Sequence, residues 1–294
     1  MRQAVKDRFP RLAQDQPGTQ LADLQRQFAY DRFLSRVFRV DPDQWVLKGA
    51  AAMLARLGAR ARHTLDIDLY RQQGDLDEAE NALRAAPSLD LGDHFRFALE
   101  PGRQIVQEQH ARRIPVAAYL GVTQFAKFHV DLVVAIAMTG APEEVSQLLA
   151  IDVPGLVRSP YRVYPVVDHL ADKVCAMLEV HHREGQPAVQ STRYRDLADL
   201  AIFAHTVNVG AEALRRAITS EAERRQLELP QGLPTPAGPG WRAGYARVAR
   251  DAPLLVERDM DSAMKTVRRP IDPILVEATA GSWNPDTLKW SSDN

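Results

Sequence analysis

The chain has 294 residues, of which 45% are hydrophobic, so it can bury the core of one large domain or of two medium ones. Its formal net charge of −1 excludes the strongly basic field of general nucleic-acid-binding proteins, and contact with a nucleic acid would need a local basic patch. The single cysteine, Cys175, excludes a disulfide framework and a cysteine metal site.

The first half of the chain alternates between helical and strand patterns. Apolar residues at helical spacing predict a helix over 20–38, and a short apolar strand over 44–48 follows. After a turn at Gly49, the pattern predicts a helix of small residues over 50–57, a strand opening at Asp66, a helix over 76–86, and strands over 94–99, 112–120 and 126–134. This order predicts a mixed α/β sheet domain within residues 1–160.

From Val166 onward the pattern becomes helical. Helices are predicted over 166–182, 193–206, 211–228, 241–250 and 253–268, with a Pro/Gly loop over 229–240. The tail from Arg269 contains Pro270, Pro273 and Pro285 and shows little periodicity. The sequence therefore predicts an α+β chain in which a helical domain, residues 161–294, follows the sheet domain.

Two carboxylates open the strand that follows the small-residue helix. Asp66 and Asp68 are two residues apart, so their side chains leave the strand on one side, with Ile67 and Leu69 on the other. Carboxylates side by side repel each other, and a divalent cation such as Mg²⁺ is the usual remedy. The alternative is an edge strand whose outer face is acidic.

Other charged residues occur inside apolar segments. Asp131 lies within an apolar strand, where it either faces solvent at the strand end or faces the Asp66/Asp68 pair from a neighbouring strand. Lys173 lies within a helix, and Asp196 and Asp199 share one face of the next helix. Each of the three is also compatible with an ordinary solvated surface.

Four segments in this order resemble the AbiEii-type nucleotidyltransferase toxins, including their MenT branch. They are Lys48-Gly49-Ala50, the run Arg62-His63-Thr64-Leu65-Asp66-Ile67-Asp68, Lys173 in an alanine-containing helix, and the helix from Arg193 through Asp196 to Asp199. The resemblance implies a polymerase-β-like nucleotidyltransferase core with a helical C-terminal domain, Mg²⁺ and a nucleoside triphosphate. It also implies nucleotide addition to the 3′ acceptor end of tRNA, which blocks translation, and a cognate antitoxin.

The resemblance also implies roles for single residues. Asp66 and Asp68 would be metal-binding acids, with Asp131 as the third acid or the proton acceptor. Thr64 would contact phosphate, Lys173 would hold the triphosphate, Asp199 would be an essential acid, and Asp196 is its neighbour. Lys48, Gly49 and Arg62 complete the expected nucleotide-binding set.

One departure from the family pattern concerns the turn after the first strand. Family members commonly have Gly-Gly-Ser/Thr where this chain has Gly49-Ala50-Ala51, so one hydroxyl that could bind phosphate is missing. Arg56, Arg60 or Arg62 could compensate. A second departure is Leu65, where relatives can have a polar or basic residue.

Two other functions stay open: nucleotide transfer to a protein, such as AMPylation, and a catalytically weak binding module. A basic surface beside the acids would favour RNA, and its candidate residues are Arg103, Arg112, Arg113, Lys127, Arg215, Arg216, Arg224 and Arg225. The N-terminus has no apolar signal segment, and no apolar run is long enough to span a bilayer. A cytoplasmic monomer without a membrane partner is therefore expected.

Overall fold

The computed structural model describes residue 9 and residues 20–58, 64–105, 108–146, 155–181, 189–190, 193–238 and 240–291. The chain divides into two compact units. The sheet unit contains Met1–Ala137 and Pro142–Tyr164, and the helical unit contains Met138–Ala141 and Pro165–Asn294.

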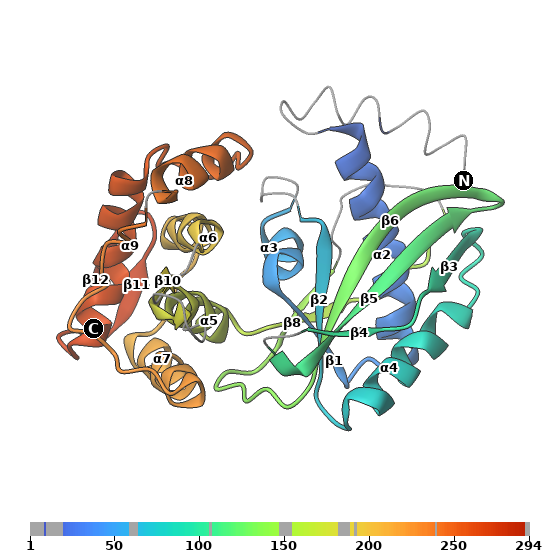
Figure 1. Cartoon of the computed structure of the whole chain (residues 1–294), viewed down its shortest axis with the longest axis horizontal. Coiled ribbons are helices and arrows are strands. Elements are labelled where there is room, and N and C mark those ends of the chain that lie inside the picture. The colour runs from blue at the N-terminus through green and yellow to red at the C-terminus, as the bar shows by residue number, and fades with distance from the viewer. Residues whose placement is uncertain are drawn as a thin grey trace. The chain divides into compact units, whose positions relative to one another are not determined.

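The sheet unit is built on a mixed β-sheet (Figure 1). Its described strands are β1 (Trp45–Lys48), β2 (Asp66–Arg71), β3 (Phe95–Leu99), β4 (Arg103–Ile105), β5 (Glu108–Leu120), β6 (Thr123–Val133), β7 (Glu143–Val145) and β8 (Tyr161–Val163). They lie in the order β3-β5-β6-β2-β1-β8-β7, and β4 pairs with β5. The central strand β2 runs parallel to β6 and antiparallel to β1. The mixed sheet agrees with the sequence prediction, whereas β4, β7 and β8 were not predicted because three residues give no readable alternation.

Three α-helices in the described part of this unit pack on the sheet: α2 (Leu21–Val40), α3 (Gly49–Leu57) and α4 (Leu76–Ala85), the last followed by the short 3₁₀ helix η2 (Ala86–Ser88). In α2, the ring of Phe33 lies 5.3 Å from that of Phe97 and 5.7 Å from that of Phe128. Helix α4 begins at a capping box in which Asp75 accepts from the backbone of Glu78. The helices thus form where their patterns predicted them.

A buried ionic network connects α2 to the rest of the sheet unit. Arg36 donates two hydrogen bonds to Asp93, at 3.0 and 2.6 Å, and Arg32 donates to Asp31 at 2.8 Å. The Tyr161 hydroxyl donates to the other oxygen of Asp31 at 2.6 Å. All four charged side chains are at most 1% exposed, so each depends on its partners.

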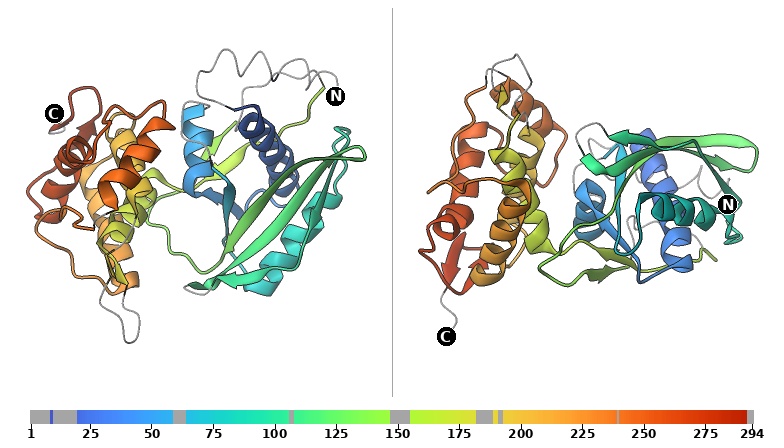
Figure 2. Two further views of the ribbon diagram at one scale, coloured as in Figure 1. Left: turned by 45° about the horizontal axis from the view of Figure 1, so that its top comes forward. Right: turned by 60° about the horizontal axis from the view of Figure 1, so that its bottom comes forward.

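The β5–β6 hairpin is the longest strand pair of the sheet (Figure 2). Its register shifts by one residue between Ala118 and Tyr119, so that Leu120 pairs with Thr123 near the turn whereas Arg113 pairs with Asp131 farther along. A shift of one residue changes the side chains that share a face.

In the helical unit the described helices are α5 (Val166–Leu178), α6 (Tyr194–Ala204), α7 (Ala211–Arg225), α8 (Trp241–Arg250) and α9 (Met260–Leu275). Short strand pairs are β9 (Val180–His181) with β10 (Val189–Gln190), and β11 (Ser282–Asn284) with β12 (Lys289–Ser291). Helix α5 ends four residues before the predicted end at 182, because Glu179 is extended and leads into β9. Helix α7 ends at Arg225 because Gln226 adopts a left-handed conformation, with φ of 55°.

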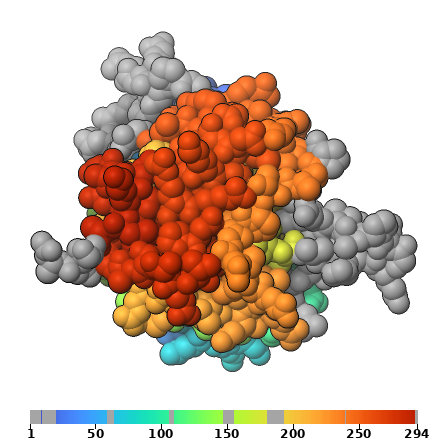
Figure 3. Space-filling view, turned by 90° about the vertical axis from the view of Figure 1, so that its left-hand side faces the viewer, coloured from blue at the N-terminus to red at the C-terminus, as the bar shows by residue number. Residues whose placement is uncertain are grey.

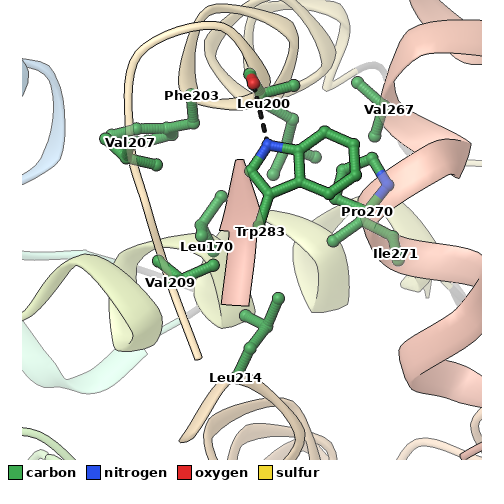
Figure 4. Close-up of a pocket in the computed structure, with 11 residues that line it drawn as sticks. Leu170, Leu200, Phe203, Val207, Val209, Leu214, Val267, Pro270, Ile271 and Trp283 are labelled. Atoms are coloured by element: carbon green, nitrogen blue, oxygen red, sulfur yellow. Dashed lines mark hydrogen bonds between the residues drawn. The ribbon is translucent and has the colours of Figure 1, made fainter. Parts of the chain in front are cut away.

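The prediction for the last part of the chain was wrong in two places. The helix predicted over 253–268 begins only at Met260 and continues through Pro270 and Pro273. The tail that showed little periodicity forms the β11–β12 hairpin. Within the hairpin, Trp283 is 1% exposed, and its indole nitrogen donates to the carbonyl of Ala204 at 2.9 Å (Figure 4).

The C-terminal segment also forms much of one surface of the helical unit (Figure 3). The core beneath it is apolar, with Leu170, Leu200, Val267 and Ile271 around the Trp283 indole (Figure 4). Among the described residues, no helix has the length and hydropathy needed to cross a bilayer.

Candidate active site

The acid pair lies at the start of the central strand β2. Ile67 and Leu69 are fully buried on one face, whereas Asp66 and Asp68 are half-buried on the other. Strand alternation therefore separates the carboxylates from the core that α2 covers. On β2 itself the local prediction and the structure agree.

Charged residues continue across the neighbouring strands in a single row. Asp131 on β6 is the register partner of Asp68, and Arg113 on β5 is the register partner of Asp131. Arg103 on β4 pairs with Arg113, and Lys48 on β1 pairs with Asp68. Directly paired residues share a face of the sheet, so the row reads two cations, two acids and one cation. We call these five residues the charged row.

Arg113 and Asp131 form a bidentate ion pair inside the charged row. Arg113 Nε donates to Asp131 Oδ1 at 2.7 Å, and Nη2 donates to Oδ2 at 2.6 Å. The Asp131 side chain is 12% exposed and that of Arg113 is 49% exposed. These hydrogen bonds raise the pKa of Arg113, and the charges of Asp131, Asp66 and Asp68 raise it further. Asp131 thus lies beside the acid pair, but a guanidinium holds it.

Gly49 gives the Asp68 carboxylate room at the start of α3. The residue has φ of +58°, and a Cβ there would lie 1.8 Å from Asp68 Oδ2. Only glycine fits both the backbone angle and the close approach. The Asp68 carboxylate therefore lies beside the first residue of α3, at the positive end of the helix dipole.

Residues around the acid pair have defined contacts. The Thr64 hydroxyl donates to Asp66 Oδ1 at 2.7 Å, so it orients that carboxylate. Lys48 Nζ lies 4.3 Å from the centre of the Tyr164 ring, a cation–π contact. Ala51, which takes the place of the family hydroxyl, is fully buried in α3.

Of the arginines that could replace this hydroxyl, Arg60 and Arg62 lie outside the described residues. Arg56 is described, and it donates to the carboxylate of Glu143 at 3.3 Å and to the carbonyl of Tyr164. Burial lowers the pKa of Arg56, although the Glu143 charge opposes this shift.

The remaining predicted residues gather in the helical unit. Lys173 Nζ donates to Asp199 Oδ2 at 2.6 Å and to Asp196 Oδ1 at 2.9 Å. The side chains of Lys173 and Asp199 are 6% and 0% exposed, so the solvated-surface alternative is wrong for these two residues. The structure thus brings Lys173, Asp196 and Asp199 together as a buried ionic trio.

The basic residues divide between paired and exposed. Arg112 lies on the opposite face from Arg113 and donates to Glu80 and Asp77 at 2.6 and 2.9 Å. In the helical unit, carboxylates accept from Arg216, Arg224 and Arg225, and the carbonyl of Thr279 accepts from Arg215. Arg103 and Lys127 are exposed, and the register places both on the face of the acids.

The acid pair meets some of the requirements of a divalent-cation site. Among the described residues, no group of three or more His, Cys, Asp or Glu side chains is placed to hold a metal ion. The donors that are present nevertheless suit Mg²⁺, because Asp66 and Asp68 offer hard carboxylate oxygens on one face and Gly49 leaves space at Asp68. The third acid, Asp131, is adjacent but bound to Arg113.

Sequence reasoning did not identify Arg113 as part of this site and grouped it with the surface charges. The feature of the sequence that could have indicated this pairing is the predicted hairpin, because residues 113 and 131 lie on two strands joined by a turn at Gly121-Val122. Counting outward from that turn pairs Asp131 with Arg112, whereas the register shift makes Arg113 its partner.

Comparisons with known proteins bear on the family and the fold of the chain. The family model "Nucleotidyl transferase AbiEii toxin, Type IV TA system" matches residues 32–273. A search of curated proteins finds no match. Among solved structures, the chain is similar to MenT4, a nucleotidyltransferase toxin from Mycobacterium tuberculosis H37Rv, with 15% identity and a TM-score of 0.56 over 92% of this chain and 88% of that chain.

A second similar structure is that of a proposed nucleotidyltransferase from H. pylori, with 13% identity and a TM-score of 0.46 over 90% of this chain and 99% of that chain. The similarity to MenT4 shows the fold, a polymerase-β-like nucleotidyltransferase sheet followed by helices. The predicted fold class is therefore confirmed.

Proposed function

The chain belongs to the family of AbiEii nucleotidyltransferase toxins of toxin–antitoxin systems, and we propose that it adds nucleotides to the 3′ acceptor end of tRNA. The observation that supports a nucleotidyl-transfer site best is the charged row, in which Asp131 is the register partner of Asp68. Asp66 lies two residues before Asp68 on the same strand and face. Such a transfer to tRNA would block aminoacylation and so translation.

In the proposed reaction, the terminal hydroxyl oxygen forms a bond to the α-phosphorus of a nucleoside triphosphate. The bond from that phosphorus to the pyrophosphate oxygen breaks, and pyrophosphate leaves with the electron pair. The hydroxyl proton passes to a carboxylate, for which Asp131 is the candidate because it lies beside the acid pair. Arg113 holds both oxygens of Asp131 in the structure, so their ion pair has to loosen for this step.

Asp66 and Asp68 are the residues that would hold Mg²⁺. The cation would supply positive charge to the phosphate oxygens and to the attacking oxygen. Thr64 fixes the orientation of Asp66 through the hydrogen bond between their side chains, and Gly49 keeps the approach to Asp68 open. Lys48, Gly49, Thr64 and Arg62 remain the proposed nucleotide-binding residues.

The roles of Lys173, Asp196 and Asp199 rest on the family resemblance. Within the helical unit the trio has one positive and two negative charges, and the ammonium of Lys173 donates to both carboxylates. To bind a triphosphate, Lys173 has to exchange a carboxylate for phosphate oxygens. We propose Lys173 as the residue that does so and Asp199 as the residue that positions it.

Two observations bear on the acceptor. The exposed Arg103 and Lys127 share the face of the acids, which favours an RNA backbone there. Against this, many arginines that could extend a basic surface donate to carboxylates instead. This pairing supports the second candidate, nucleotide transfer to a protein side chain. For a toxin of this family, the expected protein partner in the cell is a cognate antitoxin.

The experiment that tests the proposal incubates the purified protein with total tRNA, Mg²⁺ and each α-labelled triphosphate in turn. The matched control is Asp66→Asn, which keeps the shape of the side chain and removes its charge. Label on tRNA that is absent with Asp66→Asn would support the proposal and identify the nucleotide. Label on a protein added in place of tRNA, with none on tRNA, would favour the second candidate.

A further inference from the structure

The Arg113–Asp131 ion pair places a fixed cation beside the proposed metal-binding acids. Within the sheet unit, Arg113, Asp131 and Asp68 are successive register partners on three adjacent strands. Side chains of such partners start about 5 Å apart on the same face, within strong electrostatic reach at a partly buried position. The charge on Arg113 therefore acts on the acid pair as well as on Asp131.

The ion pair also uses both oxygens of the carboxylate. Asp131 accepts from Nε at one oxygen and from Nη2 at the other, and its side chain is only 12% exposed. A bidentate guanidinium neutralises the carboxylate and fixes its plane. The Arg113 side chain is 49% exposed, so it can move into solvent and release the acid without opening the core.

We propose that Arg113 is a positioning residue that withholds Asp131 from the metal site until the guanidinium is displaced, and so sets the affinity of the acid pair for a divalent cation. The proposal rests on the proposed function, because it takes Asp66 and Asp68 as the metal-binding acids. With Arg113 in place, Asp66 and Asp68 would be the two acids that hold the cation, and release of Arg113 would add Asp131 as the third. Affinity for a divalent cation rises with the number of carboxylate ligands and their charge.

The test measures Mn²⁺ binding to the full-length protein without nucleotide, from the electron paramagnetic resonance signal of the free ion. Compared with the wild-type protein, Arg113→Gln is expected to bind Mn²⁺ about tenfold more tightly, because the Asp131 carboxylate is no longer held by a guanidinium and can act as a third ligand. The double variant Arg113→Gln/Asp131→Asn is expected to return to the wild-type affinity. Thermal unfolding of each variant shows that it is folded.

The matched control is Arg112→Gln. Arg112 precedes Arg113 on β5 and has the same charge, but it contacts Glu80 and Asp77 on the other face of the sheet. Its replacement removes one positive charge from the protein and leaves the charged row unchanged. Mn²⁺ affinity of this variant is therefore expected to stay within about twofold of wild type.

Each other outcome has a definite meaning. An Arg113→Gln variant that binds Mn²⁺ no more tightly than wild type, while Asp66→Asn weakens binding, would overturn the role of Arg113 and leave the proposed metal site standing. Equal tightening in Arg113→Gln and in the double variant would overturn it too, because the gain would not pass through Asp131. Equal Mn²⁺ binding by wild type and Asp66→Asn would overturn the metal site and the role of Arg113 together.

Discussion

At the scale of single residues, Gly49 has the most demanding geometry of the site. Replacing it by alanine is expected to cost about 1–3 kcal/mol of unfolding free energy for the positive φ, and to displace Asp68 because the new Cβ would lie 1.8 Å from Oδ2. Gly49→Ala should therefore lose both stability and nucleotidyl transfer. Urea unfolding and the labelled-triphosphate assay measure the two effects.

The chain offers a matched control for this prediction at the other end of α3. Gly58 has φ of +69°, but a Cβ there meets nothing within 4 Å. Gly58→Ala therefore isolates the backbone cost, and it should destabilise the protein while transfer remains. Equal loss of transfer in both variants would show that the contact with Asp68 is not what matters at Gly49.

Sequence reasoning at this scale succeeded where the cause is local. Alternation along β2 is enough to separate Asp66 and Asp68 from Ile67 and Leu69. Whether Asp131 faces the pair depends instead on strand order and register, which are set by packing of the whole sheet. The pairing of Arg113 with Asp131 depends on one extra residue in β6 of the hairpin, and no local sequence pattern predicts its position.

At the scale of elements, the position of α2 depends on Asp93, which accepts hydrogen bonds from Arg36. Burial alone would raise the pKa of Asp93, but the hydrogen bonds from Arg36 and from the backbone of Phe95 outweigh it, and the pKa lies below its usual 3.8. A depressed pKa in the folded state means that the ionised carboxylate stabilises the fold. This contribution is present above the unfolded pKa and is lost as pH falls through the folded value.

The Asp93→Asn variant tests this linkage. At neutral pH it is expected to lose about 3–5 kcal/mol of unfolding free energy, because the buried guanidinium of Arg36 loses its counter-ion. Below about pH 4 the difference in unfolding free energy from wild type should shrink, because Asp93 of the wild-type protein becomes protonated and is then uncharged, as asparagine is. Urea unfolding at several pH values measures this. Asp90→Asn, at an exposed position in the same segment, should change little at any pH.

The C-terminal hairpin gives a second prediction at the scale of elements. Trp283 is 1% exposed and donates to Ala204, so Trp283→Ala is expected to cost about 3–5 kcal/mol of unfolding free energy. Trp290 lies opposite it in the register and is only half-buried, so Trp290→Ala should cost about 1 kcal/mol. Circular dichroism during urea unfolding compares the two. Equal losses would contradict the role of Trp283 in the helical core.

The same region shows why the sequence did not predict every element. Pro270 and Pro273 are strong breakers, and each removes one backbone hydrogen bond of a helix. Helix α9 nevertheless continues to Leu275, because Val267, Pro270, Ile271 and Ile274 form one buried face. Tertiary burial thus outweighs the local preference, and only the packed structure shows the balance.

At the scale of the whole molecule, charge pairing limits how the enzyme can bind RNA. The formal net charge is −1, and arginines of both units donate to carboxylates. Exposed cations on the face of the acids include Arg96, Arg103 and Lys127. Within the part of the sheet unit that the structure describes, a tRNA acceptor would therefore contact few cations through its phosphates.

Binding of tRNA is accordingly expected to depend weakly on salt. Neutralising two or three phosphates predicts an affinity loss of less than about a hundredfold between 50 and 200 mM salt, whereas a broad basic surface with six to ten contacts would lose about a thousandfold or more. Fluorescence anisotropy of labelled tRNA with the Asp66→Asn variant, which is expected not to transfer nucleotides, measures the slope.

Single substitutions can show which residues cause the salt dependence of tRNA binding. Lys127→Gln should weaken tRNA binding and make the slope shallower by about one, because Lys127 is exposed on the face of the acids. Arg216→Gln is the matched control, since Arg216 donates to Glu212 at 2.6 Å and its charge is already partly compensated. A thousandfold salt effect that Lys127→Gln leaves unchanged would contradict this prediction, because the phosphates would then lie against other cations. Failure of tRNA to bind at any of these salt concentrations, together with transfer of label to a protein, would favour a protein acceptor.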